Sequence, residues 1–133
     1  MTKSAPIALM MALLAVASFA LSTCGSASGP ELTVRAYIDA VNAGDKDKFV
    51  SLWSPDTQES SSTTWDYYTT FEMKFPTVKK IVVQDFPGNP DLKEVTVEVV
   101  EESSMGKHDK TLRFGLSQQE GQWYLISPPI SVT

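Results

Sequence analysis

The chain has 133 residues, a formal net charge of −5 and a single cysteine. This length accommodates one domain of ordinary size. Acidic residues outnumber basic ones by 16 to 11, and the basic residues are scattered, so the sequence lacks the basic stripe of a nucleic-acid-binding surface. Because Cys24 is the only cysteine, an intramolecular disulfide is excluded.

The start of the chain has the composition of an export signal. Residues 1–6 carry one charge, on Lys3, and residues 7–21 carry none. This apolar run of about 15 residues is shorter than the roughly 20 that a membrane-spanning helix needs. A basic residue, a short apolar run and then small residues are typical of a signal peptide, which takes no part in the folded domain.

The segment that follows this run predicts a lipid anchor. Leu21-Ser22-Thr23-Cys24 resembles the lipobox of bacterial lipoproteins, in which a leucine lies three positions before a cysteine and small residues lie between them. The resemblance implies that Cys24 becomes the first residue of the mature protein and carries acyl chains such as palmitate. Thr23 departs from the pattern, which usually has Gly, Ala or Ser there. The alternative is an ordinary secretory signal cut after Ala20.

We therefore divide the chain into a signal peptide over residues 1–23, a flexible tether over residues 24–30 and a domain over residues 31–133. Loss of the signal peptide removes Lys3 and no acid, so the formal net charge becomes −6. The tether is rich in glycine and serine, and six such residues reach roughly 13 Å. Anchored through Cys24, the domain would lie close to the cell membrane or outer membrane, outside the cytoplasm.

Residues 31–43 are predicted to form an amphipathic helix. Glu31 and Arg35 are four positions apart in the order that favours an ion pair, and Gly44 is a typical helix stop. The apolar face follows the i, i+3, i+4, i+7 spacing and consists of Val34, Tyr37, Ile38 and Val41.

A second helix is predicted over residues 45–54, with Asp45 as its cap and Pro55 after its end. Residues 57–64 are polar and rich in serine, which predicts a loop. Residues 65–75 suit a strand or a helix, and we predict a short helix. The expected apolar residues of these two helices are Phe49, Leu52 and Trp53 in the second, and Trp65, Tyr68, Phe71 and Phe75 in the third.

The rest of the chain has the two-residue period of β-strands. Strands are predicted over residues 78–85, 93–101 and 122–127, with a further one between the last two. The alternating inward residues are Val95, Val97, Val99, Leu112, Phe114 and Leu116, followed by Trp123 and Leu125 in the last strand. Two or three helices before an antiparallel sheet of about four strands predict an α+β domain with the helices on one sheet face.

Two segments carry a family resemblance. Residues 33–45 look like the first helix and the Gly-Asp junction of the nuclear transport factor 2-like superfamily, and residues 120–125 look like its last hairpin and strand. The chain is similar in particular to small bacterial lipoproteins of that fold. The resemblance spans nearly all of the mature chain and implies a cystatin-like α+β cone, in which a curved sheet wraps around a long helix and encloses a pocket.

Enzymes of that superfamily, such as ketosteroid isomerases and cyclases, use a pocket aspartate for acid–base chemistry. Such chemistry needs a carboxylate shielded from water. Asp39 is expected on the polar face of the first helix, which disqualifies it. Glu72 would lie within the aromatic arc of the third helix and is the one catalytic candidate. Its alternative is a place at the edge of that arc, where the carboxylate reaches water.

No metal site or cofactor is expected. His108 is the only histidine and is predicted to lie in a solvated turn. One histidine and an acylated cysteine do not supply the ligands of a transition metal. Residues 45–48 begin like a calcium loop but lack its third acidic position, its glycine and its distal glutamate.

Six aromatic side chains could line a ligand pocket, although such side chains more often belong to the core, because a domain of roughly 100 residues needs that apolar area to fold. They are Tyr37, Trp53, Trp65, Tyr68, Phe71 and Trp123. Binding asks only for an apolar concavity with a few polar groups. We therefore predict a lipid-anchored binding or scaffold module for a small apolar ligand or an envelope protein. The alternative is a cofactor-free isomerase or cyclase-like enzyme that uses Glu72.

Overall fold

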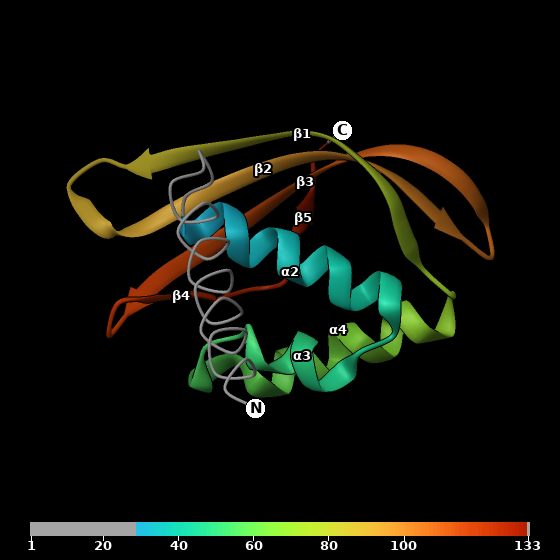
Figure 1. The fold of residues 1–133 in the computed structure, drawn as a ribbon, viewed down its shortest axis with the longest axis horizontal. Coiled ribbons are helices and arrows are strands. Elements are labelled where there is room, and N and C mark those ends of the chain that lie inside the picture. The colour runs from blue at the N-terminus through green and yellow to red at the C-terminus, as the bar shows by residue number, and fades with distance from the viewer. Residues whose placement is uncertain (1–28, 133) are drawn as a thin grey trace, which may run out of the picture.

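The computed structural model describes residues 29–132, which form helices packed on one face of a curved antiparallel sheet (Figure 1). The predicted signal peptide and Cys24 lie outside these residues. The helices are α2 (Gly29–Ala43), α3 (Lys46–Ser51), the 3-10 helix η1 (Pro55–Thr57) and α4 (Gln58–Thr70). The strands are β1 (Lys74–Phe86), β2 (Asn89–Ser103), β3 (Gly106–Gln119), β4 (Gln122–Leu125) and β5 (Ile130–Ser131). The predicted α+β class is confirmed.

The sheet is an antiparallel meander in the order β1-β2-β3-β4, and the short β5 pairs with β3 as well. β4 and β5 occupy the same edge of β3, since Leu116 pairs with Leu125 and Arg113 pairs with Ile130. β5 was not predicted. A strand of two residues has no period to detect, and it follows two prolines that normally end a strand.

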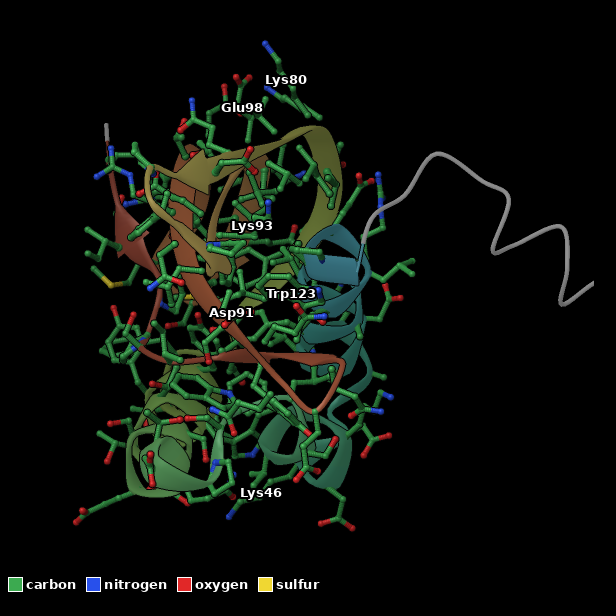
Figure 2. All side chains as sticks on the ribbon, turned by 90° about the vertical axis from the view of Figure 1, so that its left-hand side faces the viewer. Lys46, Lys80, Asp91, Lys93, Glu98 and Trp123 are labelled. Carbon is green, nitrogen blue, oxygen red and sulfur yellow. The ribbon has the colours of Figure 1, made fainter. Side chains whose placement is uncertain are left out.

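The inner face of the sheet carries the predicted alternation. Val95, Val97 and Val99 are at most 1% exposed, and their partners on β3 include Phe114 and Leu112. The outer face is polar, and Figure 2 shows the cross-strand neighbours Lys80 and Glu98 pointing away from the helices. This division is what a sheet with one buried and one solvated face requires.

Helix α2 follows the predicted pattern. All four residues of its predicted apolar face are buried, and Glu31 accepts a hydrogen bond from Arg35 Nε at 3.0 Å. The helix stops at Gly44, whose φ of +71° suits a residue without a Cβ. Asp45 then caps α3, because its carboxylate accepts the Lys48 backbone N–H at 3.1 Å.

The loop predicted over residues 57–64 is wrong, because α4 begins at Gln58. The stretch is polar, yet Ser61 is fully buried and donates its hydroxyl to the Gln58 carbonyl oxygen. The Gln58 amide donates to the Trp53 carbonyl oxygen at 3.1 Å and ties the helix start to the preceding segment. Further along α4, Tyr68 packs against Tyr37 of α2, so local and tertiary contacts together stabilise a helix that its composition disfavours.

The boundaries that follow α4 also differ from the prediction. The helix ends at Thr70, and the chain reverses through Glu72, whose φ is +53°. β1 begins at Lys74, four residues before the predicted start, and includes Pro76. Proline is tolerated there because β1 is an edge strand. No helix in residues 29–132 is long and apolar enough to cross a membrane.

Substitution of Val97, which faces the helices, tests whether this face of the sheet is the buried one. Val97→Ala removes buried methyl groups and leaves a cavity, so we expect the free energy of unfolding to fall by roughly 2–3 kcal/mol. Val82 lies opposite Thr96 on the outer face and is partly exposed. Val82→Ala is the matched control and should change stability by about 0.5 kcal/mol or less. Equal losses in urea unfolding would contradict the assignment of the two faces.

Candidate ligand-binding site

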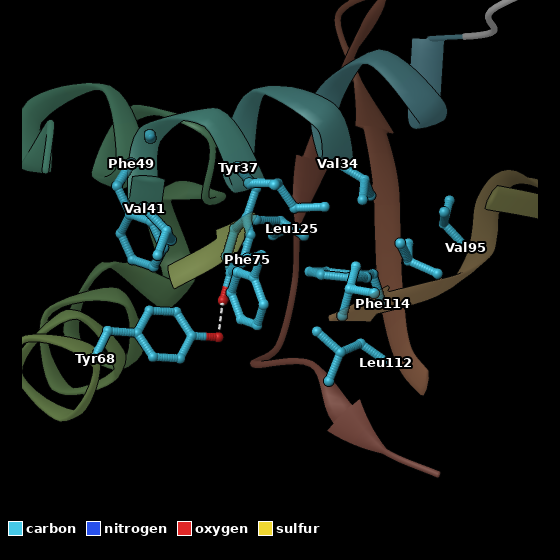
Figure 3. Close-up of a cluster of buried hydrophobic side chains, with 14 of the residues drawn as sticks. Val34, Tyr37, Val41, Phe49, Tyr68, Phe75, Val95, Leu112, Phe114 and Leu125 are labelled. Carbon is cyan, nitrogen blue, oxygen red and sulfur yellow. Dashed lines mark hydrogen bonds between the residues drawn. The ribbon is translucent and has the colours of Figure 1, made fainter. Parts of the chain in front are cut away.

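Aliphatic and aromatic side chains together form the core between the helices and the sheet (Figure 3). The Tyr37 ring lies at the centre, with its centroid 4.8 Å from that of Phe49 and 5.0 Å from that of Phe114. Trp53 is 1% exposed and packs beside them. Two of the predicted pocket aromatics, Tyr37 and Trp53, therefore lie in the packed core.

The other four predicted pocket aromatics lie in different places. Trp65 packs on the core from α4, and Phe71 lies just after the end of that helix. Trp123 is on β4 beside the start of α2, where the Thr33 hydroxyl donates to its carbonyl oxygen at 3.1 Å. Tyr68 is the member of the set that lines two cavities, of about 400 and 420 Å³, next to α4. The six side chains do not converge on one pocket.

The first cavity, of about 400 Å³, lies between the end of α2 and the end of α4. Glu72 lines it, but this residue is exposed to solvent. Lys74 closes another side and donates through Nζ to the Asn42 carbonyl oxygen at 3.2 Å. The catalytic candidate of the sequence thus lies at a rim and reaches water. The lining residues are Val41, Gly44, Trp65, Tyr68, Thr69, Glu72, Met73 and Lys74.

The second cavity, of about 420 Å³, lies on the other side of Tyr68. α4 forms one wall, the inner face of β2 and β3 forms another, and the segment around Pro128 and β5 closes it. Its volume is within the usual range of small-molecule sites, roughly 300–1,000 Å³. The apolar lining consists of Tyr67, Tyr68, Met73, Phe75, Leu112, Pro128 and Pro129.

Two charged side chains of the second cavity, Glu101 and Lys110, were missed by the sequence analysis. Glu101 is two residues beyond Val99, and Lys110 pairs with Val99 in the register of β2 and β3. Both therefore lie on the inner face, where the apolar alternation gives way to charge. Both are half-buried, and neither forms an ion pair within 4.0 Å in the part of the chain that the structure describes. The sequence does contain a signal for them: side chains two positions apart on a strand face the same side, so Glu101 shares the inner face with Val99.

A buried pair of hydroxyl groups lies beside this cavity. Tyr37 Oη and Tyr68 Oη are 2.6 Å apart, and the bond is drawn in Figure 3. Both tyrosines are buried, but Tyr68 lines both of the larger cavities, whereas Tyr37 lines neither. A buried donor without an acceptor costs about 1–3 kcal/mol, and the Tyr37 proton would be such a donor if Tyr68 donated to it. We therefore infer that Tyr37 donates and Tyr68 accepts, which leaves the Tyr68 proton for a group in a cavity.

Both hydroxyl groups remain protonated at neutral pH. Burial raises the pKa of Tyr37 well above its usual range, and the proximity of Tyr68 raises it further. Burial also raises the pKa of Tyr68, although the hydrogen bond from Tyr37 works in the opposite direction. The Glu101 carboxylate adds to the rise in the pKa of Tyr68, because a second negative charge nearby is unfavourable.

No group of three or more His, Cys, Asp and Glu side chains that could hold a metal ion occurs within residues 29–132. Asp45 serves as a helix cap. His108 lies near the start of β3 and not in a turn as predicted, and its side chain is exposed.

Comparison with known proteins identifies the fold. No family model and no curated protein matches the sequence. An uncharacterised protein with a cystatin-like fold from Caulobacter vibrioides superposes with a TM-score of 0.66 at 15% identity, over 79% of this chain and 88% of that one. A protein with a cystatin-like fold from Nostoc punctiforme gives a TM-score of 0.60 at 12% identity, over 77% of this chain and 86% of that one.

A scytalone dehydratase-like protein from Novosphingobium aromaticivorans gives a TM-score of 0.58 at 12% identity, over 79% of this chain and 83% of that one. The dehydratase activity in the name of that protein is a property of that protein and is not transferred to this chain. At these identities the similarities establish the fold alone, which is the cystatin-like, nuclear transport factor 2-like fold that the sequence resemblance implied.

Because the pKa values of Tyr37 and Tyr68 are raised in the folded protein, we expect the protein to lose stability at alkaline pH. Below pH 10 both tyrosines are protonated in the folded and unfolded chains, so the pair leaves stability independent of pH. Above pH 10 the unfolded chain ionises first, and stability falls by up to about 1.4 kcal/mol per pH unit for each tyrosine. Urea unfolding at pH 9, 10 and 11 should show a shallower decline for the double variant Tyr37→Phe/Tyr68→Phe. An unchanged slope would contradict the assignment.

Proposed function

We propose that this domain is a binding module that takes a small apolar molecule into the second cavity. The observation that carries the proposal is the cavity of about 420 Å³ that Met73, Phe75 and Leu112 line beside an otherwise filled core. Removal of apolar surface from water is the driving force for such binding. Glu101 and Lys110 supply the few polar groups that orient a ligand in such a site.

Binding fits the geometry better than catalysis does. An acid–base enzyme places a shielded carboxylate and a polarising partner in one cavity. Glu72 is exposed at the first cavity, and Glu101 on the wall of the second cavity is only half-buried, so neither carboxylate is shielded from water. The buried Tyr37 and Tyr68 hold their protons and serve as hydrogen-bonding groups, not as bases.

A lipid on Cys24 is the second part of the proposal. It is supported by the lipobox resemblance of Leu21 to Cys24 and by the short distance in sequence from Cys24 to the start of α2 at Gly29. Figure 1 shows that α2 begins near the end of the sheet where β1 turns into β2, whereas the β2–β3 turn lies at the opposite end. The second cavity adjoins this opposite end. An anchored domain would thus present the cavity away from the bilayer.

A bulky side chain on α4 should block the ligand. Thr63 lines the second cavity, and its neighbour Ser62 is exposed and lines neither of the larger cavities. N-phenyl-1-naphthylamine, a neutral apolar fluorophore, should bind with a saturable rise in fluorescence. We expect Thr63→Trp to weaken this affinity about tenfold, equivalent to about 1.4 kcal/mol, and Ser62→Trp to leave it unchanged. Unsaturable fluorescence, or the same loss in both variants, would refute the proposed site.

Lipidation is tested on the protein extracted from membranes of its producing cells. Intact-mass measurement should show a chain that lacks residues 1–23 and carries added acyl mass on Cys24. Cys24→Ser should abolish both the acyl mass and membrane retention, because the acylated thiol is then missing. A free thiol on the mature chain, or cleavage after Ala20, would overturn the anchor.

A further inference from the structure

Tyr68 and Glu101 give the second cavity one hydrogen-bond donor and one acceptor. Tyr68 accepts a hydrogen bond from Tyr37 and keeps its own proton for another group. Both Tyr68 and Glu101 line the second cavity, one from α4 and the other from the inner face of β2. A carboxylate oxygen accepts and does not donate. A bound group would therefore need to accept from Tyr68 and to donate to Glu101.

We propose that the ligand is an apolar alcohol or phenol whose hydroxyl group lies between Tyr68 and Glu101. This inference rests on the proposed function of the second cavity and names the chemical class that the cavity selects. A hydroxyl group has one proton to donate and lone pairs that accept, so it satisfies both protein groups at once. The apolar body of the ligand would occupy the space beside Met73, Phe75 and Leu112.

Other ligand classes satisfy fewer of these groups. A hydrocarbon leaves Tyr68 and Glu101 unpaired, and a ketone accepts from Tyr68 but offers Glu101 no proton. A carboxylate would be attracted by Lys110 but repelled by Glu101, and both line the same cavity. A protonated amine would pair with Glu101 but has no lone pair for the Tyr68 proton. Among these classes, the alcohol alone meets both requirements.

Four probes of nearly equal shape test this inference: indane, 1-indanone, 2-indanol and indane-2-carboxylate. Each is titrated into the ¹⁵N-labelled protein, and affinities are taken from amide shifts of residues that line the second cavity. Because 2-indanol forms hydrogen bonds that indane cannot form, we expect it to bind about five- to tenfold more tightly than indane, equivalent to about 1–1.4 kcal/mol. The affinity of 1-indanone should fall between these two, and the carboxylate should bind no more tightly than indane.

Variants separate the hydroxyl of Tyr68 from the general shape of the cavity. Tyr68→Phe should remove most of the preference for 2-indanol over indane, a loss of about threefold or more. Tyr124 lines neither of the larger cavities, and its hydroxyl donates to Gln122 Oε1 at 3.0 Å, so the matched control Tyr124→Phe should keep the preference. Tyr37→Phe/Tyr68→Phe leaves no stranded proton on Tyr37 and should behave as Tyr68→Phe if the single variant folds poorly.

The outcomes distinguish this inference from the proposed function. If none of the neutral probes binds, the second cavity is not an apolar ligand site and both fail. If indane and 2-indanol bind equally, or if Tyr124→Phe reduces the preference as much as Tyr68→Phe, the alcohol inference alone is overturned. Tightest binding of the carboxylate would also overturn it and would make Lys110 the selecting group.

Discussion

The structure depends on the burial of one aromatic side chain, Tyr37. Its ring contacts α3 through Phe49 at 4.8 Å, α4 through Tyr68 at 6.2 Å and β3 through Phe114 at 5.0 Å between ring centroids. A buried phenol gains packing energy from its ring but must satisfy its hydroxyl group. The bond of 2.6 Å to Tyr68 meets that need and couples the position of α4 to the core. The helices α3 and α4 and the strand β3 are thereby packed around one residue of α2.

The position of α4 in turn creates both cavities. This helix is mostly polar, and only Ser61 and Tyr68 in it are classed as buried. It therefore contacts the core along a narrow line and leaves space on each side of Tyr68. A helix with a wide apolar face would pack closely against the sheet and fill this space. The composition that concealed α4 from the sequence analysis is thus also the reason that the domain has cavities.

The ends of the strands decide the chemistry of the second cavity. The inner face is apolar where α2 covers it and becomes charged at Glu101 and Lys110, beyond the helices' closest packing. Half-buried charges without ion partners among the described residues retain the capacity to orient a bound molecule. The first cavity has an exposed carboxylate, Glu72, at its rim and lacks such an arrangement.

The sequence by itself determined α2, its stop at Gly44, the Asp45 cap of α3 and the inner faces of β2 and β3. Burial on one side imposes a local period that survives in the residue order, and caps and stops depend on adjacent residues. The sequence did not determine α4 or β5, whose stability comes from contacts with residues distant in the chain. The sequence also indicated six aromatic pocket candidates, but not which of them lie together. In the structure Tyr37 lies wholly inside the core, whereas Tyr68 also lines the cavities. Only the tertiary structure brought Tyr68 and Glu101 together, since the cavity they share is bounded by elements far apart in sequence.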